Sequence, residues 1–130
     1  MERSVAGIWI VEGRVFVARR GASGSQEGRW EFPGGKVEGG ETDQEAVARE
    51  FKEEFEIAAS VRELVGTASF THKGRERELA AWLIEVEKGA TPQLLEHTET
   101  SWALPEELDG LDFVESDRKL LPFVLPLLGS

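Results

Sequence analysis

The sequence predicts an α/β fold in which helices pack on the faces of a central mixed β-sheet. Strand-like segments open the chain, a long amphipathic helix follows them, and further strands precede a helical C-terminus. An alternation of strands, helix, strands and helix favours a sheet covered by helices. The chain has 130 residues, which fits a single domain spanning residues 1–130.

The first two strands are expected to form a hairpin. Residues 4–11 and 14–18 are rich in β-branched and aromatic residues, and Glu12-Gly13 separates them. This pattern is typical of a β-hairpin. The polar, Gly- and Ser-rich residues 21–28 then predict a loop.

Residues 30–32 predict a short strand that stops at a tight turn over Pro33-Gly34-Gly35. Two glycines in succession allow the backbone to turn sharply or to approach a ligand closely. Gly35 would place a bare carbonyl and amide near the start of the following helix. Lys36 supplies a mobile cation that suits a phosphate oxygen.

The clearest helix is predicted over residues 41–55. Thr42 or Glu41 can open it, and the acidic residues of its first turn suit the positive end of the helix dipole. Apolar residues recur near helical spacing along one stripe: Ala46, Val47, Phe51 and Phe55.

The second half of the chain predicts an antiparallel strand pair, two connections and two helices. The strands are expected at 61–69 and 78–86, with a turn within 72–75, followed by a polar connection over 91–100. Pro105 suits the first turn of a short helix that ends at Leu108. A final helix is expected over 116–128, with Ser116 or Asp117 as its cap and Pro122 disturbing its middle.

Charge and composition exclude several classes of function. The formal net charge of -10 repels a phosphate backbone, so polymeric nucleic acid is not expected as a partner. No apolar run is long enough to span a membrane, and residues 5–11 predict a strand and not a signal peptide. The absence of cysteine suits a reducing cytoplasm.

Glu50, Glu53 and Glu54 carry the main functional hypothesis. Positions i, i+3 and i+4 share one face of a helix, so these carboxylates are expected to lie close together and to repel each other. Carboxylate oxygens are natural ligands of Mg²⁺, which also recruits substrate phosphates. The alternative is an ordinary solvated acidic helix face, because Glu is a good helix former.

The segment from Gly35 to Ile57 resembles the signature of the Nudix hydrolases, G-x5-E-x7-R-E-U-x-E-E-x-G-U, in which U is a bulky aliphatic residue. The spacing is kept throughout. Phe51 replaces an aliphatic residue of the signature, and Glu56 stands where the signature has Gly. That glycine provides a left-handed helix cap, so Glu56 is expected to cost on the order of 1 kcal/mol in strain.

The whole chain is similar to the MutT-like branch of this family, and the resemblance implies an α/β/α sandwich and a set of site residues. Mg²⁺, with Mn²⁺ as a substitute, would bind Glu50, Glu53, Glu54 and the Gly35 carbonyl. Glu41 and Arg49 would form a pair that orients the loop and the helix. Glu96 resembles a further metal-associated or base glutamate of the branch, and its alternative is an ordinary loop residue.

The resemblance implies that water attacks a nucleoside triphosphate and releases a nucleoside monophosphate and pyrophosphate. Carboxylates of the helix, Glu50 among them, would serve catalysis with the metal. Glu53 is the first choice for the proton-accepting base and Glu96 the second. Lys36 would neutralise charge on the phosphates, and the enzyme would work as a monomer or a homodimer.

Three residues outside the signature resemble the base-reading positions of MutT-like enzymes. Arg20 matches a base-reading arginine, Phe32 would stack on a base or, preferably, fill the core, and Asp117 would contact the base edge or only cap the last helix. An ionised carboxylate accepts hydrogen bonds but cannot donate them. His72 and His97 have no partner at metal-ligand spacing and receive no role.

The favoured substrate is 8-oxo-dGTP, as expected for an enzyme that cleans the nucleotide pool. The alternatives are a (d)CTP or 5-substituted pyrimidine nucleotide pyrophosphohydrolase, a hydrolase of another X-linked diphosphate, and a Nudix-fold nucleotide sensor without activity. The last of these is disfavoured because every glutamate of the signature is present.

Overall fold

The first two strands form the expected hairpin in a computed structural model, which describes residues 2–21 and 27–128. β1 covers Glu2–Val11 and β2 covers Arg14–Arg20, and they pair at the closed end of the hairpin. Glu12 and Gly13 both have positive φ, 52° and 76°, as a type I′ hairpin turn requires. Most of the loop predicted over 21–28 lies outside the described residues.

The sheet is mixed, as predicted. Within the described residues its strands run in the order β3-β2-β1-β6-β5, with β4 added to β1 and β7 added to β2. β1 and β6 are parallel and the other pairings are antiparallel. The remaining strands are β3 (Trp30–Glu31), β4 (Gly34–Lys36), β5 (Ala59–His72), β6 (Arg75–Val86) and β7 (His97–Ala103).

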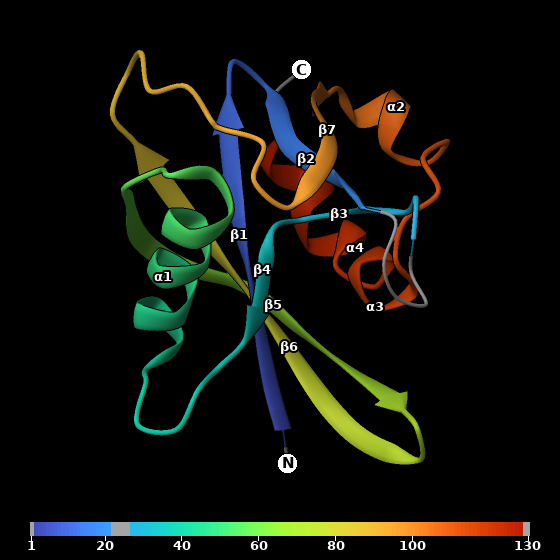
Figure 1. The fold of residues 1–130 in the computed structure, drawn as a ribbon. Helices are drawn as coiled ribbons and strands as arrows, with labels where there is room; N and C mark the ends of the chain where they lie inside the picture. The colour runs from blue at the N-terminus through green and yellow to red at the C-terminus, as the bar shows by residue number, and fades with distance from the viewer. Residues whose placement is uncertain (1, 22–26, 129–130) are drawn as a thin grey trace.

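The predicted β5–β6 pair is confirmed, and both strands are longer than expected. The turn between them falls within the predicted segment, at Lys73 and Gly74, which have positive φ. Since β6 also pairs with β1 along eight residues, the hairpin is anchored in the middle of the sheet. Its tip extends beyond the rest of the molecule (Figure 1).

The tight turn predicted at Pro33-Gly34-Gly35 is wrong, because Gly34 and Gly35 belong to strand β4 and pair with β1. The two glycines allow β4 to approach β1 closely and do not form a turn. A Cβ on Gly34 would lie 1.9 Å from the carbonyl oxygen of Val5. The strand therefore brings the Gly35 backbone against helix α1 without a side chain in between.

Helix α1 covers Asp43–Phe55 and begins at Thr42, which confirms one of the two predicted openers. Thr42 and Glu45 form a capping box, with hydrogen bonds of 3.1 and 2.9 Å. Asp43 accepts hydrogen bonds from Arg3 on β1 and Trp82 on β6, which tie the helix start to the sheet. The predicted apolar stripe is fully buried.

The final helix predicted over 116–128 is broken into α3 (Glu115–Arg118), α4 (Leu121–Val124) and a 3₁₀ turn, η1 (Leu125–Leu127). Pro122 and Pro126 lie at the starts of the later pieces, where the missing N–H costs no hydrogen bond. The predicted cap is also wrong, because Val114 precedes α3 and Asp117 lies inside it. The short helix α2 (Pro105–Leu108) is confirmed.

The polar connection predicted over 91–100 is wrong in its second half, because β7 begins at His97 and pairs with β2. Only one side of β7 has a partner among the described strands. Edge strands commonly carry charged and polar residues. The sequence of a segment such as Thr98-Glu99-Thr100 therefore resembles that of a loop, although the segment forms a strand.

Two separate cores confirm the α/β/α sandwich. One core lies between the sheet and α1 and includes Phe51 and Phe55, and the other lies between the sheet and the C-terminal helices. Figure 1 shows α1 and the helices α2–α4 on opposite sides of β1. Among the described residues, no helix is long and apolar enough to cross a membrane.

Glu56 caps the C-terminus of helix α1 and has the left-handed conformation expected of the position (φ 56°, ψ 37°). We expect Glu56→Gly to raise the free energy of unfolding by about 1 kcal/mol, because glycine adopts this conformation without a Cβ clash. Urea unfolding measures the change. Glu56→Ala is the matched control, since alanine keeps the Cβ; equal stability of the two variants would contradict the assignment of strain.

Candidate functional site

Arg49 forms the centre of an ionic network on α1. Its guanidinium donates to Glu41 at 2.6 and 3.1 Å, to Glu50 at 2.8 Å and to Glu53 at 3.0 Å. It also donates to the backbone carbonyl of Lys36 at 3.0 Å. The hydrogen bond from Arg49 holds the pKa of Glu41 below its usual range. One cation thus joins the helix, the preceding loop and strand β4.

The three helix carboxylates lie at different depths. Glu54 is buried, the Glu50 side chain is 14% exposed and the Glu53 side chain is 53% exposed. A Cβ on Gly35 would lie 2.6 Å from Glu50 Oε1. The helix face therefore runs from solvent at Glu53 to the interior at Glu54, with Glu50 against the glycine backbone.

A cavity of about 280 Å³ opens at this face. It is lined by residues from five places in the sequence: Arg20 and Gly21, Glu31, Gly34 and Gly35, Glu54, and Glu96 with His97. Carboxylates, an arginine and glycine backbone in one cavity suit a divalent cation together with phosphate groups.

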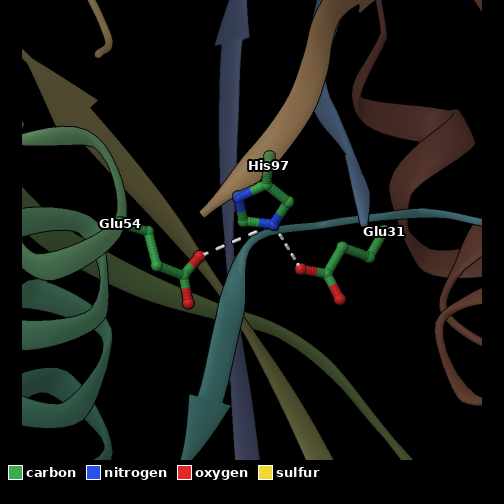
Figure 2. A group of neighbouring side chains, drawn as sticks. All are labelled: Glu31, Glu54 and His97. Atoms are coloured by element: carbon green, nitrogen blue, oxygen red, sulfur yellow. Dashed lines mark hydrogen bonds and ion pairs between the residues drawn. The ribbon is translucent and has the colours of Figure 1, made fainter. Parts of the chain in front are cut away.

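His97 lies between Glu31 and Glu54 in this cavity (Figure 2). Its Nε2 is 2.8 Å from a Glu31 oxygen and 3.9 Å from Glu54 Oε1. The other Glu31 oxygen accepts a hydrogen bond of 2.8 Å from Arg20. Glu31 comes from β3, Glu54 from α1 and His97 from the first residue of β7, so the tertiary fold brings them together.

Burial raises the pKa of Glu54 far above its usual range, and the neighbouring Glu50, Glu31 and Glu96 add to the shift. Its Oε1 is buried and has no hydrogen-bond partner among the described residues. An unpartnered buried carboxylate oxygen is costly. The oxygen faces a cavity lined by other acidic groups, which is an arrangement that a bound cation would stabilise.

Asp117 is buried on α3, behind the cavity. Its Oδ2 accepts a 2.8 Å hydrogen bond from the backbone N–H of Phe32, and Ser116 Oγ donates to Oδ1 at 3.3 Å. Burial, with the charge of Glu31, raises the pKa of Asp117 to about 7. Near neutral pH this carboxyl group is therefore partly protonated, and a protonated carboxyl group can both donate and accept hydrogen bonds.

We expect the stability of the protein to depend on the titration of Asp117. The pKa of Asp117 in the folded protein lies above the ordinary 3.8. Its contribution to the free energy of unfolding is therefore fully present below about pH 4 and is lost as pH rises to about 7. Asp117→Asn removes this dependence, so its stability relative to the parent should rise by up to about 4 kcal/mol between pH 4 and pH 8. Urea unfolding across this range measures it.

Asp112→Asn is the control for this experiment, because the Asp112 side chain is 77% exposed. Its stability relative to the parent should stay constant over the same pH range. A flat difference for Asp117→Asn as well would contradict the raised pKa of Asp117.

The structure brings most of the predicted site residues to one region. Arg20, Gly35, Glu54 and Glu96 line the cavity. Glu50 and Glu53 are not among its lining residues; Glu50 lies against Gly35, and both accept hydrogen bonds from Arg49. Lys36 is exposed at the end of β4. Phe32 is buried in the core, with its ring 5.2 Å from that of Phe113, in agreement with the preferred packing role.

Sequence reasoning missed His97 and Glu31. His97 has no His or Cys close to it in sequence, and the two carboxylates that it approaches lie on other elements. A signal did exist for Glu31, because a charge between the aromatic residues Trp30 and Phe32 in a short strand is seldom buried without a partner.

The comparisons with known proteins agree with this geometry. The model of the NUDIX domain family matches residues 1–124. The CTP pyrophosphohydrolase of Escherichia coli is 37% identical over 126 residues, covering 97% of this chain and 93% of that protein. A Mycobacterium tuberculosis protein named "Putative 8-oxo-dGTP diphosphatase 2" is 37% identical, covering 88% of this chain and 81% of that protein.

Among solved structures, the solution structure of the E. coli ORF135 protein superposes with a TM-score of 0.85 at 37% sequence identity. The match covers 98% of this chain and 90% of that chain. The same layered arrangement of sheet and helices therefore extends over essentially the whole of both proteins.

Proposed function

Since the chain belongs to the Nudix hydrolase family, we propose that it hydrolyses a nucleoside triphosphate to a nucleoside monophosphate and pyrophosphate with Mg²⁺ as its cofactor. The observation that carries the proposal is the cavity in which Glu54 and Glu96 face the glycine backbone of β4. The names of the Escherichia coli and Mycobacterium tuberculosis relatives both describe enzymes that act on nucleotides.

The residues present fit a divalent cation. Two observations support this: Glu54 Oε1 is buried without a hydrogen-bond partner among the described residues, and the Glu50 carboxylate lies against Gly35. Glu50, Glu53 and Glu54 would hold Mg²⁺ together with the Gly35 carbonyl, and Glu96 would add a further carboxylate. When bound, the metal would neutralise phosphate charge and lower the pKa of a bound water.

The protein groups would divide the remaining work. Glu53 would accept the proton of the attacking water, with Glu96 as the second candidate for this role. Arg49 would hold Glu50 and Glu53 in place through its hydrogen bonds, with Glu41 orienting the guanidinium. Lys36 would neutralise charge on the chain of phosphates.

The base would be read near Arg20 and Asp117. These residues line a second, smaller cavity with Phe32 and Phe70, next to the first. A carboxyl group at this position suits the exocyclic amine of guanine or cytosine. We retain 8-oxo-dGTP as the first candidate, and the full-length similarity to a CTP pyrophosphohydrolase supports (d)CTP as the second.

A nucleotide panel tests the proposal. Rates for 8-oxo-dGTP, dGTP, dCTP and 5-substituted dCTP are measured side by side with Mg²⁺, and pyrophosphate and phosphate are both quantified. We expect pyrophosphate as the product and at least one nucleotide to be turned over. Binding without turnover of any nucleotide would instead indicate a sensor, and turnover of nucleotide sugars or dinucleoside polyphosphates alone would indicate a different substrate class.

The site of action is inferred from the substrate and the composition. Nucleoside triphosphates are cytoplasmic metabolites, and a chain without cysteine suits a reducing compartment. We infer that the protein works in the cytoplasm.

A further inference from the structure

The group formed by Glu31, Glu54 and His97 differs in chemistry from the all-oxygen site on α1. One ligand atom from each residue, a ring nitrogen from His97 and one oxygen from each carboxylate, lies within 4.8 Å of the other two. Neighbouring ligand atoms around a tetrahedral first-row metal ion lie roughly 3–3.5 Å apart. A side-chain movement of about 1 Å would therefore bring the three atoms into one coordination sphere.

The imidazole is held in place for such a role. The ring of His97 stacks on Phe55, with centroids 5.0 Å apart and planes inclined by 14°, and its side chain is only 5% exposed. Nδ1 is buried and has no hydrogen-bond partner among the described residues. Nε2 lies 2.8 Å from a Glu31 oxygen, and an ionised carboxylate only accepts hydrogen bonds. A cation at Nε2 would therefore take the place of the proton shared with Glu31, and the unpartnered Nδ1 could carry the ring proton instead.

The two carboxylates are also arranged for a cation. Glu54 Oε1 is buried, has no hydrogen-bond partner among the described residues and faces His97 Nε2. Glu31 is held by Arg20 through one oxygen only, so the oxygen that faces His97 can change partner while the side chain stays in position. The donor set is two carboxylate oxygens and one imidazole nitrogen.

We propose that Glu31, Glu54 and His97 form a binding site for a first-row transition-metal ion, with His97 Nε2 as its nitrogen ligand. Imidazole nitrogen raises affinity for transition metals over Mg²⁺, which prefers oxygen. The site shares Glu54 with the proposed magnesium site but does not depend on which nucleotide is cleaved. Its ligands would be more buried than Glu53, because the His97 and Glu54 side chains are 5% and 8% exposed and that of Glu53 is 53% exposed.

Pulsed EPR of the full-length protein with Mn²⁺, without nucleotide, tests the site directly. The chain contains two histidines and no cysteine, so a directly bound imidazole nitrogen can come only from His97 or His72. We expect a ¹⁴N coupling to Mn²⁺ in the parent, its loss in His97→Gln and its retention in His72→Gln. His72 is the matched control because it is the last residue of β5 and does not line the cavity that contains Glu54.

Zn²⁺ affinity, measured by competition with a chromophoric chelator, gives a second reading. We expect His97→Gln and Glu31→Gln each to weaken Zn²⁺ binding at least tenfold, and His72→Gln to change it less than twofold. Circular dichroism is used to check that each variant is folded. Glu31→Gln leaves the imidazole intact and tests the site even if His97→Gln does not fold.

A parent protein without nitrogen coupling, or a coupling that persists in His97→Gln, would overturn the proposal. Equal Zn²⁺ affinity of the parent and the folded Glu31→Gln variant would do the same. The hydrolytic function is judged separately by pyrophosphate release in the nucleotide panel, because neither metal measurement requires a substrate.

Discussion

Glu54→Gln is expected to lower kcat/KM for the best nucleotide by about 10²- to 10³-fold, because it removes a charged oxygen ligand from the proposed magnesium site. Metal coordination contributes several kcal/mol of transition-state stabilisation, and each 1.36 kcal/mol corresponds to a factor of ten. Steady-state kinetics at saturating Mg²⁺ measure the loss. Raising the Mg²⁺ concentration should restore activity only in part.

The same variant should be more stable than the parent when no metal is present. Burial raises the pKa of Glu54, so its ionisation destabilises the folded state increasingly as pH rises above the ordinary carboxyl range. Glutamine keeps the shape and carries no charge. We therefore expect a higher Tm for Glu54→Gln in EDTA at pH 8, and a smaller difference at pH 4.

Glu56→Gln is the matched control, since it makes the same chemical change two residues away on an exposed side chain. This variant should keep both its activity and the pH dependence of its Tm close to those of the parent. A Glu54→Gln variant with parent-like activity would remove Glu54 from the metal site, and a lower Tm in EDTA would contradict the cost assigned to its burial.

Glu53→Gln is expected to lower kcat by about 10²- to 10⁴-fold, the range typical of losing a general base. The amide oxygen can still accept the hydrogen bond that Arg49 donates to Glu53 at 3.0 Å. The fold should therefore persist, with a Tm within a few degrees of the parent. A fall in kcat with little change in Tm separates catalysis from structural damage.

Glu96→Gln decides between the two candidate bases. Glu96 is exposed and lines the cavity, whereas Glu53 lies at the rim of the ionic network. If Glu53 is the base, Glu96→Gln should lower kcat less than about tenfold and Glu53→Gln far more. The opposite order would transfer the role to Glu96, and parent-like rates for both would leave neither as the base.

The elements predicted from the sequence are those with a strong local pattern. The α1 stripe and its Thr42 cap, the hairpin at Glu12-Gly13 and the β5–β6 turn depend on residues close in sequence, and all are confirmed. The errors arose where tertiary contacts decide. Gly34 and Gly35 look like turn residues, but they form a strand because β1 needs a partner that lacks side chains.

The same distinction applies to the site. Helical geometry predicts that Glu50, Glu53 and Glu54 share one face of a helix. The long signature predicts the pairing of Glu41 with Arg49, which the structure contains. The contact of His97 with Glu31 and Glu54 joins three elements that are distant in sequence. No periodicity within one segment could predict it.

The Arg49 network has a consequence for the charge of the acidic helix face. One guanidinium donates hydrogen bonds to Glu41, Glu50 and Glu53, so it offsets the repulsion between neighbouring carboxylates. A cation held by Glu50 and Glu53, as proposed for magnesium, would have to share these oxygens with Arg49 or replace it. Its affinity would then depend on the strength of the hydrogen bonds that Arg49 gives up.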